Sequence, residues 1–447
     1  MRDLLGDEYP EFERSLGERA VRGIRVNESK ISVEKFLGVT SLTLTPISYT
    51  KDGFIPKEDE LGKSPEHHAG MFYVQDPGAM ATVNALDIGE GWCVLDACAA
   101  PGGKSSQLAS KIGDGGFLFA NEYLPRRAKI IVGNLERLGV RNAVVTSLDT
   151  KEFPRMFSAV FDLVLCDAPC SGEGMFRKYE SAVSEWSEEN VLLCSKRQKE
   201  ILANCAPLVK AGGYLLYSTC TYSKEENEDV ISDFISKHPD FFIVPVKEEL
   251  AKATKGGVVS PGEQDALSLS RRFYPHVSGG EGQYVALLKR DENIGVLPTI
   301  FYKNEQKTPS KEECAIVNKF FVDNLSKIPE GRLIKQGNGI ALVTHDFPIP
   351  KSSVFMAGVM LGEIRKGIFF PHHQLFSAYG KDFIRQENLE RGDARWKKYL
   401  FGEEIPTSDP DMQGYVAILY EGVALGGGKA SGGTIKNHYP KGLRNNR

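Results

Sequence analysis

Two short sequences place thiols and a carboxylate where they could act together. DAPCSG carries Asp167 and Cys170 and follows the apolar run 161–166, while STCTYS carries Cys220 and follows the apolar run 213–217. Continuous apolar runs of this length are typical of strands buried on both faces of a parallel sheet. In an open α/β sheet the ligand site lies beyond the carboxyl ends of the strands. We therefore expect both thiols and the carboxylate to face one cleft.

A thiol pair beside a carboxyl group suits methylation of a pyrimidine carbon. Carbon 5 of cytosine is a poor nucleophile, but a thiolate that adds to carbon 6 turns the ring into an enamine, which can attack a sulfonium methyl group. Asp167, placed at ring nitrogen 3, would assist as a general acid. The second thiol, or a water molecule that it positions, would assist loss of the carbon 5 proton and release of the enzyme. The spacing does not decide between Cys170 and Cys220 as the nucleophile; in DNA cytosine methyltransferases the nucleophile follows a proline, as Cys170 does.

The glycine-rich loop CAAPGGK, residues 98–104, follows the apolar run 93–97 and precedes a helix predicted at 105–112. Backbone amides at the start of a helix favour anionic or polar groups. A Walker A motif would need glycine at the position of Cys98, and the adjacent glycines lack the GxGxxG spacing of dinucleotide-binding loops. The remaining interpretation is a nucleoside-bearing ligand without a long pyrophosphate, and S-adenosylmethionine fits that description.

Acidic residues end the next two predicted strands. Glu122 closes the strand predicted at 117–122, where it could accept hydrogen bonds from ribose hydroxyls, as the acid of dinucleotide folds does. Asp149 follows the strand predicted at 143–147, where the adenine edge would lie. A single acid at such a position is more often a surface carboxylate. The loop and the two acids at three successive strand ends nevertheless favour a cofactor site.

The alternation of strands and helices predicts an α/β fold with a doubly wound, Rossmann-like core. We expect the strands at residues 93–97, 117–122, 143–147, 161–166, 213–217 and 283–289, and the helices at 80–86, 105–112, 125–138 and 224–237. The last strand is expected to complete the sheet.

The chain, with 447 residues, is too long for a single hydrophobic core. We expect a small α/β domain at 1–74, the catalytic domain at 75–290, an appended domain at 291–385 and a β-rich module with glycine turns at 386–447. The last two parts show no catalytic pattern, so we interpret them as binding modules.

The composition limits the location of the protein and its metal content. No run of about 18 apolar residues could span a membrane, and the N-terminus lacks the apolar core of a secretory signal. The eight cysteines form no CxxC pair, which fits a reducing cytoplasm and argues against a structural metal. His67 and His68 have no third ligand nearby, so they are not expected to hold a metal either.

The charge pattern indicates which kind of molecule the protein binds. The formal net charge is −4, but basic residues cluster at Arg271–Arg272, at 395–398 and in the stretch 422–447, which has no acidic residue. Any one such cluster is most often a solvated surface. Combined with the catalytic core they favour RNA, because a phosphate backbone responds to local fields more than to net charge.

Three sequences, LDACAAPGGKSSQLA, DAPCSGEGMFRK and YSTCTYSKEENE, resemble the motifs of the RNA 5-cytosine methyltransferases of the Nol1/Nop2/Sun group, in particular its bacterial RsmF-type branch. The resemblance continues in GIRVN, GMFYVQDPGAM and RRFYPHVSGGEGQYVALL. The sequence GTIKNHYPKGLR is similar to the end of that branch's PUA-like module, so nearly the whole chain is covered. One departure is the run 426–429, GGGK, where a bulkier residue is expected among the glycines.

The resemblance implies methyl transfer from S-adenosylmethionine to carbon 5 of cytosine in 16S rRNA through a covalent cysteine adduct. It implies that Cys220 is the nucleophile and that Cys170 assists release of the product, with Asp167 and Lys104 in the catalytic set. For the cofactor it implies Cys98, Ala99, Ala100, Pro101, Gly102, Gly103, Lys104, Glu122, Asp149 and Asp167. It also implies RNA-binding domains at both ends, a partner in rRNA or the small ribosomal subunit, no metal, and a monomer.

Two alternatives stay open. One is an enzyme with the same donor site that acts on tRNA or on protein, and the other is a ribosome-assembly protein whose methylase core is vestigial. A protein or small-molecule methylase would not need two thiols at strand ends. Intact Cys220, Cys170 and Asp167 argue against a vestigial core.

Overall fold

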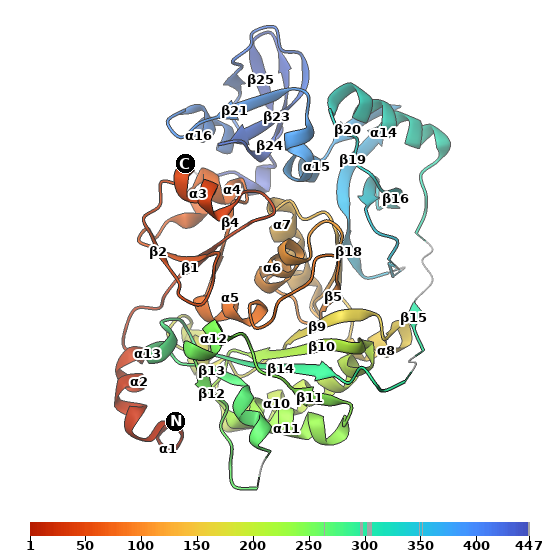
Figure 1. Cartoon of the computed structure of the whole chain (residues 1–447). Coiled ribbons are helices and arrows are strands. Elements are labelled where there is room, and N and C mark those ends of the chain that lie inside the picture. The colour runs from red at the N-terminus through yellow and green to blue at the C-terminus, as the bar shows by residue number, and fades with distance from the viewer. Residues whose placement is uncertain (263, 296–297, 302–305, 348, 351, 446–447) are drawn as a thin grey trace.

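The computed structural model describes residues 1–262, 264–295, 298–301, 306–347, 349–350 and 352–445 (Figure 1). The last two residues of the basic stretch 422–447 therefore lie outside the described residues. In Figure 1 a large sheet fills the lower half of the molecule, and the C-terminal sheet lies at the top.

The central sheet has ten strands among the described residues, in the order β12-β13-β14-β10-β9-β5-β6-β7-β18, with β11 also paired to β14. The strands are β5 (Cys93–Asp96), β6 (Phe117–Asn121), β7 (Ala143–Thr146), β9 (Phe161–Asp167), β10 (Val209–Thr219), β11 (Phe241–Ile243), β12 (Lys255–Gly256), β13 (Arg271–Phe273), β14 (Gln283–Arg290) and β18 (Val354–Ala357). The five strands β10, β9, β5, β6 and β7 are parallel neighbours, which confirms the predicted parallel core.

Helices cover both faces of this sheet. One face carries α5 (Pro77–Val83), α6 (Gly103–Ile112) and α7 (Pro125–Arg137), and the other carries α8 (Phe153–Met156), α10 (Glu188–Cys205) and α11 (Glu228–Lys237). Alternate residues of β9 face the two layers: Leu163 packs in the cluster of Ile131, and Val164 packs in the cluster of Leu202. Because both faces are buried, residues 163–166 of the strand are all apolar, and this is why its centre shows no alternation.

The strand predicted at 283–289 is β14, but it does not complete the sheet. It runs antiparallel to β10, and β13 pairs with its other side. At the opposite edge, β18 pairs antiparallel with β7. The sheet is therefore mixed, with a parallel centre and antiparallel borders.

Two predicted helices differ from the structure for local reasons. The helix predicted at 224–237 is interrupted at Asn227, whose side chain accepts a hydrogen bond from Thr219 Oγ1 and donates one to the Thr221 carbonyl. The helix predicted at 80–86 is α5, which begins earlier because the Asp76 side chain accepts hydrogen bonds from the first backbone amides.

The N-terminal region has α1 (Arg2–Leu5), α2 (Tyr9–Leu16), α3 (Val33–Val39) and α4 (Pro65–His68). Its sheet has the order β2-β3-β1-β4, with β1 (Gly23–Val26), β2 (Leu44–Pro46), β3 (Gly53–Pro56) and β4 (Phe72–Gln75). This is the small α/β unit that the sequence predicts.

The region after β14 contributes to the central sheet as well as forming a sheet of its own. That sheet, β16 (Arg332–Gln336), β17 (Gly339–Val343), β19 (Val359–Arg365) and β20 (Ile368–Pro371), is accompanied by α14 (Lys311–Asn324) and α15 (His373–Tyr379). Phe347 stacks on Phe117 of β6 with ring centroids 4.0 Å apart, and β18 extends the central sheet. Within 291–385, Phe347 and β18 are thus built into the core, so this part of the chain is more than an appendage.

The C-terminal module is a five-stranded sheet with α16 (Arg395–Leu400). Its order is β21-β23-β24-β25-β22, with β21 (Gln386–Leu389), β22 (Ile405–Pro406), β23 (Gly414–Tyr420), β24 (Val423–Ser431) and β25 (Thr434–Asn437). The glycine run lies in β24, where a Cβ atom on Gly427 would stand 2.4 Å from the ring of Phe376 in α15. Because these glycines carry no side chains, α15 packs closely on β24.

One hydrophobic core joins the two ends of the chain. Ile24 and Phe36 of the N-terminal region pack in the same cluster as Tyr399 and Val416 of the C-terminal module. The two regions, far apart in sequence, are thus one folding unit in space.

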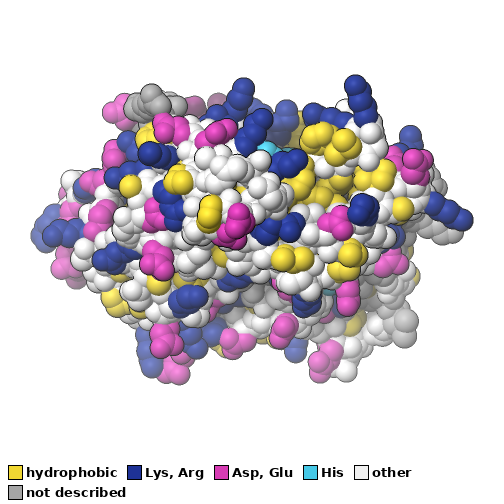
Figure 2. Space-filling model, turned by 90° about the horizontal axis from the view of Figure 1, so that it is seen from above, with side chains coloured by type: hydrophobic (Ala, Val, Ile, Leu, Met, Phe, Trp, Pro, Cys, Tyr) yellow, Lys and Arg dark blue, Asp and Glu magenta, His cyan; other side chains and the backbone are white. Residues whose placement is uncertain are grey.

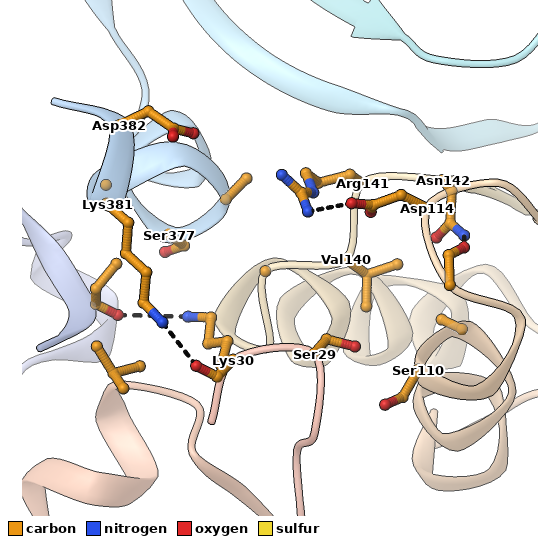
Figure 3. Close-up of a pocket in the computed structure, with 17 residues that line it drawn as sticks. Ser29, Lys30, Ser110, Asp114, Val140, Arg141, Asn142, Ser377, Lys381 and Asp382 are labelled. Atoms are coloured by element: carbon orange, nitrogen blue, oxygen red, sulfur yellow. Dashed lines mark hydrogen bonds and ion pairs between the residues drawn. The ribbon is translucent and has the colours of Figure 1, made fainter. Parts of the chain in front are cut away.

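Lys30 lies at the junction of three parts of the molecule. Its Nζ donates hydrogen bonds to the carbonyls of Ala69 (2.9 Å), Arg137 (3.0 Å) and Ala424 (3.3 Å). Figure 3 shows Lys30 beside a cavity of about 310 Å³, where Lys381 donates to the Lys30 carbonyl (2.8 Å). Burial of the ammonium group, with Arg137 and Lys381 nearby, lowers the pKa of Lys30 to about 7. The predicted catalytic residues do not line this cavity.

Candidate active site

The carboxyl ends of β9 and β10 bring the predicted catalytic groups together. β9 ends at Asp167, which is paired in the sheet with Ser218 of β10. Asp167 Oδ1 accepts a hydrogen bond from Ser218 Oγ (2.6 Å), and its Oδ2 accepts one from Lys104 Nζ (2.8 Å). Groups from two different elements therefore fix the orientation of the carboxylate.

The two predicted thiols face each other beside this carboxylate. Cys170 Sγ lies 3.3 Å from Cys220 Sγ, and the backbone amide of Cys220 donates to Cys170 Sγ at 3.4 Å. The side-chain hydrogen bond with Cys220, together with burial, raises the pKa of the Cys170 thiol well above its ordinary value. Cys170 is therefore held as a protonated thiol at neutral pH.

Lys104 is a fixed positive charge in this site. Burial alone lowers its pKa, but the attraction of Asp167, with smaller contributions from Cys220 and Asp96, outweighs that effect, so the net pKa is raised. The ammonium group stays charged at any pH at which the enzyme would work.

Glu173 holds the loop that follows Cys220. Its Oε2 accepts hydrogen bonds from the Tyr222 amide (2.9 Å) and from Thr221 Oγ1 (3.0 Å), and its Oε1 accepts one from Ser223 Oγ (2.7 Å). The residue after Glu173 donates its amide to the Cys220 carbonyl (2.9 Å). The loop that carries Cys170 therefore positions the loop that carries Cys220.

Glu226 holds the loop that carries Cys170. Its Oε2 accepts hydrogen bonds from the Ser171 amide (3.0 Å) and from Gln198 Nε2 (2.7 Å), and burial raises its pKa. The two thiols are thus held by a buried polar network and not only by the strand ends.

The basic pair Arg271–Arg272 does not form an RNA-binding surface, so that part of the charge prediction is wrong. Arg272 is buried, forms an ion pair with Glu228 and donates to the Tyr222 carbonyl (2.8 Å). Arg271 donates to Thr254 Oγ1 (2.9 Å). Arg271 thus holds β13 to residues 251–254, and Arg272 holds it to the loop after Cys220.

The predicted cofactor loop borders a cavity of about 280 Å³ beside the catalytic groups. Gly102 has φ +107°, a conformation that glycine adopts without strain, and Gly103 begins α6. From the predicted set, the cavity wall contains Cys98, Ala99, Ala100, Pro101, Gly103, Lys104 and Asp167. The structure thus gathers most of the predicted loop around one cavity.

Asp96, the last residue of β5, lines the same cavity and is absent from the predicted set. Its Oδ2 accepts a hydrogen bond from Ser105 Oγ (2.6 Å), whereas the buried Oδ1 has no hydrogen-bond partner among the described residues. Burial, and then the nearby Asp167, raise the pKa of Asp96 to about 7, although Ser105 and the Cys98 amide act in the opposite direction. A buried carboxylate oxygen without a partner fits a positively charged ligand.

Glu122 and Asp149 stand at the ends of β6 and β7 but do not line that cavity. The buried side chain of Asn121 joins the ends of these strands through hydrogen bonds. Glu122 forms an ion pair with Arg127 (3.3 Å). Asp149 pairs with Lys151 (2.8 Å), and the hydrogen bond from this lysine lowers the pKa of Asp149. Their roles at the cofactor stay predictions.

Asp96, Glu173 and Glu226 all lie inside the sequences whose resemblance is described above, but their types alone do not mark them. Their structural roles depend on hydrogen-bond partners from other segments. Glu173 accepts the Tyr222 amide, and Glu226 accepts the Ser171 amide. The sequence offers one signal, an acid near the end of the predicted strand 93–97, and Asp96 is that acid.

In the described part of the chain, no group of histidine, cysteine and acidic side chains could hold a metal ion. His68 instead hydrogen-bonds Tyr439 Oη (2.7 Å) of the C-terminal module through Nδ1. Nor does any helix in the described ranges have the length and apolar character to cross a membrane.

A parallel α/β sheet with a glycine-rich loop, strand-end acids and a reactive side-chain set at one edge defines an S-adenosylmethionine-dependent methyltransferase of the Rossmann-like class. Family models match three parts of the chain: 16S rRNA methyltransferase RsmB/F at residues 83–289, the N-terminal domain of 16S rRNA methyltransferase RsmF at 1–77, and the methyltransferase RsmF PUA domain at 386–445. The chain belongs to the RsmB/F family of 16S rRNA methyltransferases, and within it to the RsmF type. Enzymes of this family are S-adenosylmethionine-dependent and methylate carbon 5 of cytosine.

Relatives cover almost the whole chain. Ribosomal RNA small subunit methyltransferase F of Vibrio vulnificus is 33% identical over 440 residues, which cover 94% of this chain and 91% of that protein. The protein of the same name from Aeromonas salmonicida is 30% identical over 457 residues, with 97% and 93% covered. The crystal structure of a methyltransferase homolog protein from Pyrococcus horikoshii superposes with a TM-score of 0.56 at 28% identity and covers 65% of this chain and 92% of that one.

Proposed function

We propose that this chain methylates carbon 5 of a cytosine in 16S rRNA, with Cys220 as the nucleophile and Cys170 as the group that assists release. The observation that carries these roles is the pair of sulfur atoms 3.3 Å apart beside a carboxylate held by Lys104 and Ser218. One thiol is enough to form an adduct on the base. A second thiol in contact with it suits a reaction that must also break that adduct.

Each residue has a definite task in this proposal. The Cys220 thiolate adds to carbon 6 of the ring, while Asp167 donates a proton or a hydrogen bond to ring nitrogen 3, which gains electron density. After carbon 5 accepts the methyl group, a water molecule beside Cys170 takes the carbon 5 proton. The electron pair of that bond restores the 5,6 double bond as the carbon–sulfur bond breaks, and any proton given to nitrogen 3 returns to Asp167. Cys170, whose sulfur lies 3.3 Å from that of Cys220, is placed to donate its proton to the departing sulfur.

S-adenosylmethionine supplies the electrophilic methyl group. The loop 98–104 would hold its methionine end, and the unpartnered Oδ1 of Asp96 fits the ammonium group there. Glu122 and Asp149 would contact the ribose and the adenine from the neighbouring strand ends. Asp167 would lie between the donor and the target base.

The C-terminal module offers exposed basic groups for RNA. Lys429 lies over the ring of Tyr415 at 5.5 Å, and Lys397 lies over Trp396 at 5.4 Å, which pairs cations with surfaces that can stack on bases. Figure 2, which looks onto this end of the molecule, shows Lys and Arg side chains spread around a group of hydrophobic side chains. Arg395 is not available in the same way, because it pairs with Glu387 (2.7 Å) and a neighbouring aspartate.

The expected setting is a monomer in the cytoplasm that acts on rRNA, free or in the assembled small subunit. The same chemistry on tRNA is the second candidate. A vestigial core is disfavoured by the intact arrangement of Cys220, Cys170 and Asp167.

The test uses the parent protein, Cys220→Ala and Cys170→Ala with unmethylated 16S rRNA and radiolabelled S-adenosylmethionine. The parent should methylate carbon 5 of cytosine, mapped by bisulfite sequencing of rRNA and tRNA, and Cys220→Ala should transfer no methyl group. Cys170→Ala should accumulate a covalent RNA–protein adduct that migrates slowly on a denaturing gel. An adduct that forms in Cys220→Ala and is lost in Cys170→Ala would reverse the two roles.

A further inference from the structure

A second cavity opens beside the cavity that the loop 98–104 borders. Asp167 and Lys104 line that first cavity, whereas Cys170 and Cys220 do not. The second cavity is described here. It has a volume of about 530 Å³ and lies between the linker 18–22 that precedes β1 and the residues 55–59 at the end of β3. Three residues, Arg22, Lys178 and Tyr179, line both this cavity and the cavity of the loop 98–104. The two cavities therefore meet at one shared wall.

Part of the shared wall is held firmly in place. Lys178 Nζ forms an ion pair with Asp76 Oδ2 (2.9 Å), and the preceding Arg177 forms a buried pair with Glu281, also at 2.9 Å. Both cations are thus occupied by partners within the protein. The backbone that carries Tyr179 is fixed by these contacts.

The other two side chains of the wall have no such partners. Arg22 is exposed and the Tyr179 side chain is 58% exposed; within the described residues neither side chain makes a hydrogen bond, an ion pair or a ring contact. An unpaired guanidinium group and a free aromatic ring are the kinds of group that bind single-stranded RNA. Arginine binds phosphate oxygens, and aromatic rings stack on bases.

Three carboxylates, Glu18, Glu58 and Asp59, line this cavity, and within the described residues none of them forms an ion pair with Arg22. Asp59 is paired with Arg19 (2.6 Å), and Glu58 accepts the Thr43 amide (3.0 Å). Arg22 therefore remains available to an anionic ligand.

We propose that the shared wall is a subsite for the nucleotide next to the target cytosine, with Tyr179 stacked on its base and Arg22 bound to its phosphate. This inference rests on the proposed function, because the target base must leave its stack to reach Cys220 and its neighbour then loses a stacking partner. The aromatic ring at the rim replaces that partner. The subsite thereby positions the strand and holds the target base toward Cys220.

The experiment measures kcat/KM for unmethylated 16S rRNA. Tyr179→Ala should lower kcat/KM by about 10- to 100-fold, the range expected for one stacked base. Tyr179→Phe should retain the parent value, and Tyr179→Leu, which is apolar but has no aromatic face, should behave like Tyr179→Ala. Phe242→Ala, which removes another exposed ring (47% exposed), is the matched control and should leave kcat/KM unchanged.

Arg22→Ala should raise KM and lower the slope of log(kcat/KM) against log[salt] by about one, since one phosphate contact is lost. Arg22→Lys should keep the slope, and Arg155→Ala on α8 should match the parent. All variants should bind S-adenosylhomocysteine with the parent's affinity. A loss of that affinity would assign the wall to the cofactor site and overturn the subsite.

The failure of this inference can be told from that of the proposed function. An active parent with unchanged kcat/KM in both Tyr179→Ala and Arg22→Ala overturns the subsite alone. A fully active Tyr179→Leu overturns stacking on the ring. A parent that does not methylate 16S rRNA, free or in small subunits, overturns the function and the subsite together.

Discussion

The sulfur atoms of Cys170 and Cys220 lie 3.3 Å apart, although 50 positions separate the two residues in the chain. A disulfide needs about 2.0 Å between the sulfur atoms, so a small shift of either side chain would allow the bond. We predict that hydrogen peroxide oxidises this pair: the two thiols form a disulfide and the peroxide is reduced to two waters. Methyl transfer should stop and should return with dithiothreitol, while thiol titration in denaturant shows two thiols lost per chain.

Cys314→Ser is the control for that experiment, because Cys314 lies on α14, outside the described catalytic groups. It should be inactivated as the parent is. Inactivation that dithiothreitol cannot reverse, or a thiol count that stays unchanged, would contradict the prediction.

Asp96 should make cofactor binding depend on pH. Its pKa of about 7 means that the carboxyl group gains a proton as the pH falls through this value, and a neutral carboxyl group attracts an ammonium group less. Affinity for S-adenosylhomocysteine should therefore be level above about pH 8 and fall below pH 7, as measured by calorimetry. Asp96→Asn should bind weakly and show little change across this range; Lys104 in the same cavity stays charged throughout. A parent affinity that is flat between pH 6 and 8 would rule out this role.

The buried ion pair of Arg272 and Glu228 should matter for stability. Arg272→Ala leaves the Glu228 carboxylate buried without its partner, and such changes cost about 3–5 kcal/mol. Urea unfolding should show this loss. Lys237→Ala removes an exposed pair with Asp233 and should change stability by less than about 1 kcal/mol. A similar loss in the free energy of unfolding for the two variants would contradict the structural role of Arg272.

Lys30 should make stability rise with pH. Its pKa is about 7 in the folded protein and 10.5 ordinarily, so between these values the unfolded chain binds more protons than the folded one. Under that condition the free energy of unfolding increases with pH, by at most about 1.4 kcal/mol per unit. Lys30→Met should lack this contribution, so the difference between parent and variant should change steadily from pH 7 to 10. A constant difference would show that Lys30 does not titrate in this range.

The parallel core and the thiol pair could be predicted because the information is local. A strand buried on both faces is a continuous apolar run, as in 163–166, and the ends of neighbouring parallel strands meet at one edge. Cys170, Cys220 and Asp167 follow from this rule alone.

The remaining features depend on partners that the sequence does not specify. Arg272 looks like a surface cation until Glu228 and the Tyr222 carbonyl are placed around it. The pairing of β18 with β7 joins segments about 200 residues apart, and its apolar pattern would fit many edges. Unpartnered groups such as Tyr179 are recognised only once the cavities beside them are known.

The core that Ile24 and Phe36 share with Tyr399 and Val416 has a consequence for synthesis. The ribosome produces the N-terminal side chains first, and their apolar face stays uncovered until the last strands emerge, so the nascent chain is exposed to aggregation for most of translation. Deleting the C-terminal module would leave that face permanently bare and would damage folding along with any contact to RNA. Point substitutions of Lys429 and Lys436, both on the surface, separate the two effects.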